Sequence, residues 1–189
     1  MDARQVFTAY ERVPGAPDET AAYCSACGAV YPPPEGPHRR CERCGHVRYR
    51  NPLPAVAVII ADGERFVLCR RRSASLGHGL WCLPSGYIEW EEDYLAAGVR
   101  EVREETALDV RIDGILSVVT NYLSPAIHSL VIVLRAHVLG GSLEAGDDAA
   151  EARWYTWGEP LPPMAFEADT HIITRYFETR LSGAPVEPR

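Results

Sequence analysis

The sequence contains no lysine, so all 19 of its basic residues are arginine. This absence excludes chemistry that needs a lysine nucleophile or a lysine Schiff base. No apolar run approaches the roughly 18 residues of a membrane-spanning helix, so we expect no transmembrane segment. The first residues lack a charged stretch followed by an apolar one, so we also expect no secretory signal and a cytoplasmic protein.

Positive charge is scarce as well, and the 189 residues carry a formal net charge of −7 at pH 7. The chain as a whole thus lacks the basic surface that is typical of proteins that bind nucleic acids or membranes. The acidity lies in residues 51–189, where twenty acids face twelve arginines. We therefore expect cations to gather on the second part of the chain, and a small-molecule ligand rather than nucleic acid.

Four of the six cysteines form two CxxC pairs that are separated by thirteen residues and each followed by glycine. Two tight turns that each present two thiolates predict a closed tetrahedral site, the usual arrangement for structural zinc. Such pairs fit metal binding in a reducing compartment better than a disulfide framework. A redox disulfide or an iron–sulfur centre is the alternative. The predicted zinc ligands are Cys24, Cys27, Cys41 and Cys44.

The chain divides into three parts by composition. Residues 1–22 form a lead-in with little pattern, residues 23–50 hold the predicted zinc ribbon, and residues 53–181 form a larger α+β domain behind the stiff linker Asn51–Pro54. A content of 47% hydrophobic residues is enough for a substantial core. Periodicity and turn signals in the larger domain predict strands at 55–61, 65–72, 109–123 and 129–139, and helices at 94–106 and 167–181.

The helix predicted at 94–106 begins after Asp93, a favourable N-cap residue. Its apolar residues repeat at a spacing of four, three and four, so we expect them to form the buried stripe. They are Leu95, Val99, Val102 and Thr106.

Three glutamates, Glu101, Glu104 and Glu105, crowd another face of this helix. Like charges at this spacing cost roughly 0.2–0.5 kcal/mol per pair in an isolated helix. A divalent cation would reverse the sign of the interaction, and oxygen ligands at this density suit Mg²⁺ or Mn²⁺. The alternative is an ordinary solvated helix face, because Arg100 and Glu104 can pair at i,i+4.

The wider spacing resembles the Nudix box, G-x5-E-x7-R-E-U-x-E-E-x-G-U, in which U is a bulky apolar residue. Gly86, Glu92, Arg100 and the three glutamates occupy its fixed positions. Only the second glycine differs, and Ala107 stands in its place. Glycine at that point normally ends the helix in a left-handed conformation, so alanine there costs about 1 kcal/mol and removes no ligand.

The resemblance implies a Nudix α/β/α sandwich with a mixed sheet over residues 53–181, and the ribbon in front narrows it to zinc-ribbon Nudix hydrolases. It implies that Glu101 and Glu105 share a magnesium or manganese site with Glu104 and the Ser85 carbonyl, and that Arg100 binds Glu92. It further implies that a loop acid serves as a metal ligand or general base and that arginines of a strand contact the substrate phosphate. Aromatic or imidazole side chains would contact the nucleobase of the substrate, and the protein would form a homodimer. For the loop acid we assign Glu151, with Asp147 and Asp148 as competitors. For the phosphate we assign Arg70, Arg71 or Arg72, and for the nucleobase Tyr122, His128 or His78.

The resemblance also implies a substrate class, a nucleoside diphosphate linked to a second moiety. The ribbon, the NP-x-P linker and the PLPPMAF segment resemble a zinc-ribbon group that acts on FAD and ADP-ribose, so these two lead. An NADH pyrophosphatase is the first alternative, although residues 118–130, VVTNYLSPAIHSL, lack the SQPWPFP signature of those enzymes. Removal of nucleotide caps from RNA, which would use the arginines of the ribbon, and a non-catalytic nucleotide- or RNA-binding module are the others.

Overall fold

The computed structural model describes residues 21–33, 38–72, 77–124 and 127–186, without the side chains of Tyr122 and Ser124. Nearly all of the predicted lead-in lies outside these residues. Within them the chain forms two compact units. The larger unit comprises 54–121 and 130–186, and the smaller comprises 21–53 and 122–129.

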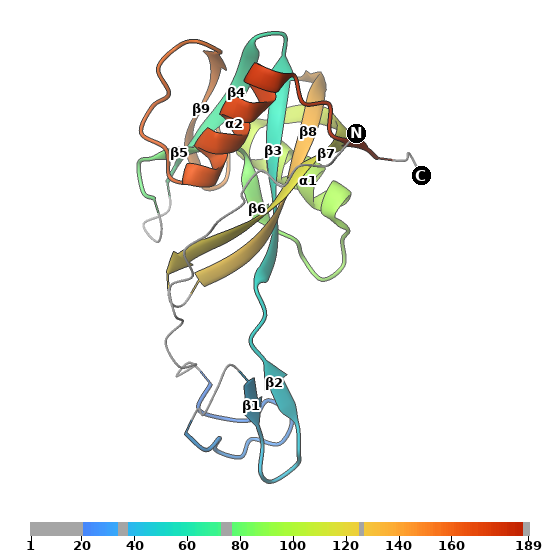
Figure 1. The fold of residues 1–189 in the computed structure, drawn as a ribbon, viewed down its shortest axis with the longest axis vertical. Coiled ribbons are helices and arrows are strands. Elements are labelled where there is room, and N and C mark those ends of the chain that lie inside the picture. The colour runs from blue at the N-terminus through green and yellow to red at the C-terminus, as the bar shows by residue number, and fades with distance from the viewer. Residues whose placement is uncertain (1–20, 34–37, 73–76, 125–126, 187–189) are drawn as a thin grey trace. The chain divides into compact units, whose positions relative to one another are not determined.

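An eight-stranded sheet and two helices build the larger unit (Figure 1). The strands follow the order β10-β7-β8-β3-β4-β5, while β6 pairs with β3 and β9 pairs with β4. The elements are β3 (Leu53–Asp62), β4 (Arg65–Arg71), β5 (Trp81–Cys82), β6 (Ser85–Tyr87), α1 (Tyr94–Thr106), β7 (Leu108–Ser124), β8 (Ile127–Gly141), β9 (Ala149–Thr156), α2 (Glu167–Thr179) and β10 (Ala184–Pro185).

The two helices cover opposite faces of the sheet. Neighbouring residues of a strand point to opposite faces, so the clusters that contain two neighbours of β4 identify the helix on each face. In β4, Leu68 belongs to a core cluster that contains Ile172 and Phe177 of α2. Its neighbour Val67 belongs to a second cluster that contains Val102 of α1. The predicted α+β fold, with a mixed sheet between helices, is confirmed.

The first predicted strand pair is present as an antiparallel hairpin. Ala61 pairs with Phe66 and Asp62 pairs with Arg65 across the turn. Gly63 adopts a φ of +63° there, which explains why an Asp-Gly turn connects the two strands.

Helix α1 begins and ends where the sequence predicts. The Asp93 side chain accepts hydrogen bonds from the backbone N–H groups of Leu95 and Ala96, at 3.0 and 2.9 Å. This contact satisfies two of the donors that a helix leaves unpaired at its start.

The predicted buried stripe of α1 is wrong in part, because the helix is rotated toward its acids. Val102 is fully buried, but Val99 is 39% exposed. Glu101 and Glu105 lie on the buried side instead. Gly98 explains the difference, because a Cβ there would lie 2.7 Å from Leu134 of β8. The helix therefore approaches the sheet along Gly98, and this carries the two glutamates inward.

Ala107 ends α1 in the left-handed conformation, with φ 56° and ψ 14°. We expect Ala107→Gly to raise the free energy of unfolding by about 0.5–1 kcal/mol, because the left-handed strain of an L-residue exceeds the extra chain entropy that glycine loses. Chemical denaturation measures the change. Ala96→Gly, on the exposed side of the same helix, is the control and should lower stability by about 1 kcal/mol. A loss of stability in both variants would contradict the assigned strain.

Helix α2 is the predicted terminal helix and ends two residues before the expected boundary, at Thr179. The helices among the described residues are too short or too polar to cross a membrane.

The smaller unit holds the short antiparallel strands β1 (His38–Arg40) and β2 (Val47–Tyr49). Its core consists of Ala21, Cys24, Tyr31 and Cys41. Arg39 is buried beside them, and its guanidinium donates to the Ala21 carbonyl at 2.6 Å and to the Pro32 carbonyl. Arg39, one of the arginines of the ribbon, therefore stabilises the fold of the smaller unit through internal hydrogen bonds.

Candidate active site

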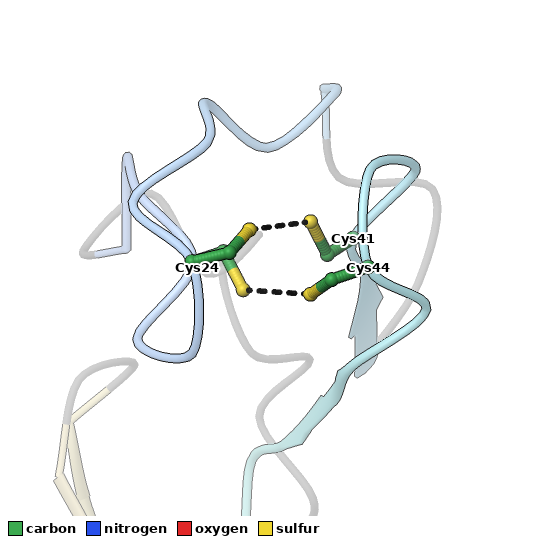
Figure 2. Close-up of side chains that lie close together, drawn as sticks. Cys24, Cys41 and Cys44 are labelled. Carbon is green, nitrogen blue, oxygen red and sulfur yellow. Dashed lines mark hydrogen bonds between the residues drawn. The ribbon is translucent and has the colours of Figure 1, made fainter.

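The four predicted zinc ligands converge in the smaller unit (Figure 2). Their sulfur atoms all lie within 4.8 Å of one another, with Cys24–Cys44 and Cys27–Cys41 at 3.7 and 3.6 Å. Zn–S bonds of about 2.3 Å in a tetrahedron place the sulfurs about 3.8 Å apart, so the spacing fits a zinc ion. The glycines that follow each pair, Gly28 and Gly45, have the positive φ angles that the tight turns require.

The electrostatics of two of these thiols, Cys24 and Cys44, also fit a bound cation. Burial opposes ionisation of Cys24, but N–H groups of Ala26 and Cys27 donate to its sulfur and lower its pKa to about 6. An N–H group of His46 favours the thiolate of Cys44, yet the neighbouring thiols outweigh it and raise the pKa of Cys44 to about 12. A bound cation would favour the thiolate form of Cys44, whose neighbours otherwise oppose it.

In the larger unit, Arg100 lies at the centre of the predicted box. Its Nε and Nη2 atoms donate to the two carboxylate oxygens of Glu92 at 3.0 and 2.5 Å. Nη2 also donates to the Tyr87 carbonyl at 3.0 Å. These bonds raise the pKa of Arg100 and lower that of Glu92. The bidentate contact joins the loop before α1 to the helix, as the family resemblance implies.

Arg100 also makes the i,i+4 contact with Glu104 that the sequence allows, together with a contact to Glu101 that the sequence did not indicate. Its Nη1 atom donates to Glu101 at 2.8 Å and to Glu104 at 3.0 Å. One guanidinium therefore bridges two of the crowded glutamates and offsets their repulsion.

Glu101 and Glu105 lie against the strand that precedes the box. The Glu101 carboxylate packs on the Cα of Gly86, where any Cβ would overlap it. Glu105 accepts a hydrogen bond from the backbone N–H of Ser85 at 3.0 Å. The first glycine of the box is thus required by contact with a carboxylate rather than by its backbone angles, and the segment of Ser85 and Gly86 meets two of the acids directly.

Burial makes these two carboxylates unusually hard to ionise. Glu105 is 2% exposed and Glu101 is 8% exposed. Burial raises the pKa of Glu105 well above its usual range, and a hydrogen bond with the carboxyl of Asp148 and its charge raise it further. Burial also raises the pKa of Glu101, against the opposing effect of Arg100. A divalent cation would favour the ionised forms, so the donor set fits such an ion.

The remaining predicted acids are arranged differently. Glu104 is the most exposed of the three helix glutamates, and its carboxylate pairs with Arg100. Glu151 forms an ion pair with Arg70 at 3.2 Å across β4 and β9. Its competitor Asp148 is the loop acid that contacts Glu105. The three helix glutamates are therefore spread around Arg100 and Ser85, and the tight ligand cluster that the described residues contain is that of the cysteines.

The predicted substrate-binding residues fall in two places. Arg72 donates from its backbone N–H to the Asp148 carbonyl at 2.7 Å and from Nη2 to the Ala149 carbonyl at 2.9 Å. It therefore fixes the start of β9 beside the acids. His128 belongs to the smaller unit, residues 122–129, and the Tyr122 side chain lies outside the description. Their contact with a base stays a prediction.

Two further charged groups lie close to the acids, and only the first of them was not identified from the sequence. Asp169 of α2 is buried and accepts a hydrogen bond from the backbone N–H of Leu83 at 2.9 Å. Burial opposes a raised pKa of Arg71, but the contact with Cys82 and the charges of Asp148 and Glu105 outweigh burial and raise the pKa of this candidate arginine. No signal in the sequence pointed to Asp169, and the run of three arginines at 70–72 does not show which one faces the acids.

Comparisons with known proteins agree with this geometry. The family model described as the NUDIX domain matches residues 51–176. An ADP-ribose pyrophosphatase from Methanocaldococcus jannaschii is 36% identical over 125 residues, 66% of this chain and 73% of that protein. An NAD-capped RNA hydrolase NudC from Deinococcus radiodurans is 32% identical over 85% of this chain, which spans only 59% of that relative's length.

A solved structure is similar over nearly the whole chain. The crystal structure of a NUDIX hydrolase from Nitrosomonas europaea matches with a TM-score of 0.73 and 28% identity, covering 89% of this chain and 97% of that one. The family model covers about two thirds of the residues and includes every position of the box. The chain therefore belongs to the Nudix family.

Proposed function

We propose that this protein uses magnesium or manganese to hydrolyse the diphosphate bond of a nucleoside diphosphate linked to a second moiety, releasing a nucleoside monophosphate. The observation that carries the proposal is the pair Glu101 and Glu105, one helical turn apart and both buried with raised pKa values. Carboxylates held in this state are costly for the fold alone. They are useful where a cation and a negatively charged substrate meet.

The residues divide this work by position. Glu101 and Glu105 hold the metal ions with Glu104 and the Ser85 carbonyl, and bound metal supplies charge neutralisation and a more acidic water. Arg100 holds the box loop through Glu92 and keeps Glu101 and Glu104 in place. Asp148, which already contacts Glu105, takes precedence over Glu151 as the loop acid that accepts a proton. Arg70 and Arg72 contribute positive charge for the distal phosphate.

ADP-ribose is the leading substrate, with FAD beside it. The 36% identical relative is named an ADP-ribose pyrophosphatase, and it aligns with two thirds of this chain. The proposal of FAD as a substrate rests on the resemblance of the ribbon, the linker and the proline-rich segment to those of enzymes that act on both compounds.

NAD-capped RNA and NADH are the second candidate. The NudC relative is named an NAD-capped RNA hydrolase, and its alignment covers 85% of this chain, more than the Nudix domain alone. A cap and a free dinucleotide present the same diphosphate to the carboxylates. The ribbon arginines are then the residues that would distinguish RNA from a small molecule.

We also propose that the four cysteines hold one structural zinc ion, since their sulfur spacing matches a tetrahedral site. The ion would serve the fold of the smaller unit and not the reaction, because four thiolates leave no open position for substrate.

A substrate panel tests the proposed reaction. The protein is incubated with Mg²⁺ and ADP-ribose, FAD, NADH, diadenosine polyphosphates or NAD-capped RNA, and the release of nucleoside monophosphate is followed by chromatography. Hydrolysis of ADP-ribose or FAD is the expected result, and hydrolysis of capped RNA or NADH alone would favour the second candidate. Turnover of no compound by a folded protein would favour a binding module instead.

A further inference from the structure

We propose that Asp169 is a positioning residue that fixes the Leu83–Gly86 segment against the metal-binding carboxylates of α1. The inference rests on the proposed function, because the segment matters only if those carboxylates hold metal. It adds to the active site a residue outside the Nudix box, on the helix that covers the opposite face of the sheet.

The Leu83–Gly86 segment is held at three consecutive residues. The Leu83 N–H donates to Asp169 Oδ2 at 2.9 Å. The Pro84 carbonyl accepts from the Val58 N–H at 2.9 Å, and the Ser85 N–H donates to Glu105 Oε2 at 3.0 Å. Leu83, the partner of Asp169, thus lies two residues before Ser85, the partner of Glu105. Of these three hydrogen bonds, the one at Leu83 is accepted by a side chain of α2.

A single residue, Pro84, separates the anchored Leu83 from the proposed ligand Ser85. Leu83 is fully buried, so its N–H has no access to water and needs a protein acceptor. If that acceptor is lost, the N–H must move to find another, and this movement pulls on Pro84 and Ser85 against the pairing of β6 with β3 that begins at Ser85. Displacement of Ser85 would carry away both its carbonyl, a proposed ligand, and the N–H that orients Glu105.

The choice of a carboxyl group at this point is not explained by the fold. Asp169 is 5% exposed, and burial raises its pKa to about 7 although the Leu83 N–H and the charge of Arg71 oppose the rise. A buried acid costs stability relative to an apolar residue of similar size. Either protonation state keeps an oxygen that can accept from Leu83, so the anchoring bond does not depend on which state is present.

Residues that orient metal ligands without touching the metal have a characteristic effect when they are replaced. Their loss typically weakens metal binding about 10–100-fold. We therefore expect Asp169→Ala to weaken Mn²⁺ binding by about that factor. Asp169→Asn should bind Mn²⁺ close to the wild-type affinity, because its amide oxygen still accepts from Leu83.

Titration of the zinc-loaded protein with Mn²⁺, followed by electron paramagnetic resonance, measures the affinity without requiring turnover. Glu105→Gln identifies the signal that comes from the box. Ile172→Val, a milder change in the same helix at a buried position, controls for loosening of α2 and should leave Mn²⁺ binding unchanged. Circular dichroism verifies that each variant is folded, and Asp169→Leu replaces Asp169→Ala if the smaller side chain prevents folding.

Weaker binding in Asp169→Ala or Asp169→Leu, with Asp169→Asn near the wild type, supports the inference. Wild-type affinity in all of the Asp169 variants, with Mn²⁺ binding still lost in Glu105→Gln, overturns it while the proposed function stands. Equal weakening in Asp169→Asn and Asp169→Ala also overturns it, because the charge would then matter and not the acceptor. A wild-type protein that binds no Mn²⁺ at the box would overturn the inference and the proposed function together.

Discussion

Replacement of Glu105 by glutamine is expected to lower kcat/KM for the best substrate by about 10²–10⁴-fold, since a bound metal contributes several kcal/mol to transition-state stabilisation and each 1.4 kcal/mol is a factor of ten. Glu105 is the most buried of the box carboxylates, contacts Ser85 and Asp148, and lies one turn from Glu101. Glutamine keeps the shape and one oxygen but removes the charge that holds a cation. Steady-state release of nucleoside monophosphate at saturating Mg²⁺ measures the loss.

The same variant should not be less stable than the wild type in the absence of metal. Burial and Asp148 already disfavour the ionised form of Glu105, so a neutral side chain relieves repulsion instead of breaking a stabilising contact. Glu64→Gln is the matched control, because Glu64 is half-exposed and pairs with Arg180 far along the chain, and it should leave turnover unchanged. Wild-type turnover by Glu105→Gln would refute its assignment as a metal ligand.

The bounds of α1 were predictable because its signals are local. Asp93 accepts from the backbone N–H groups of the first turn, and Ala107 ends the helix in the conformation that the second box glycine normally supplies. The rotation of the helix was not predictable, since it depends on the close approach of Gly98 to Leu134 of another strand. Counting apolar residues therefore gave Val99 a buried position that the packing does not provide.

In the candidate site, too, contacts within the box could be predicted from the sequence, and contacts between distant segments could not. The pairing of Arg100 with Glu92, which the family resemblance implies, is present. The proximity of Asp148 to Glu105 is set by the path of the chain into β9, where Arg72 fixes the backbone at Asp148 and Ala149. No periodicity in residues 142–156 indicates which of the three candidate acids, Asp147, Asp148 and Glu151, turns inward. Asp169 is the extreme case, because its partner Leu83 lies 86 residues away.

Replacement of Cys41 by serine is expected to remove the zinc ion and unfold the smaller unit. Wild-type protein should contain about one zinc per chain, as expected for a four-thiolate structural site, and the variant should contain almost none. Cys41 is 1% exposed and belongs to a core of four residues, Ala21, Cys24, Tyr31 and Cys41. So small a core cannot fold a segment of this length without a metal, because below about 40 residues domains usually need such support.

Atomic emission analysis of the purified variant measures zinc, and proteolysis at the ribbon measures its folding. Ser25→Ala is the matched control, because Ser25 lies within the first cysteine turn and its hydroxyl contacts the exposed His46 ring. That variant should retain zinc and resist proteolysis. The two large core clusters of the larger unit contain none of the ribbon residues. The larger unit of Cys41→Ser should therefore stay folded and still show a cooperative unfolding transition on heating. Full zinc content in Cys41→Ser would mean that the four sulfurs do not form one site, despite their spacing.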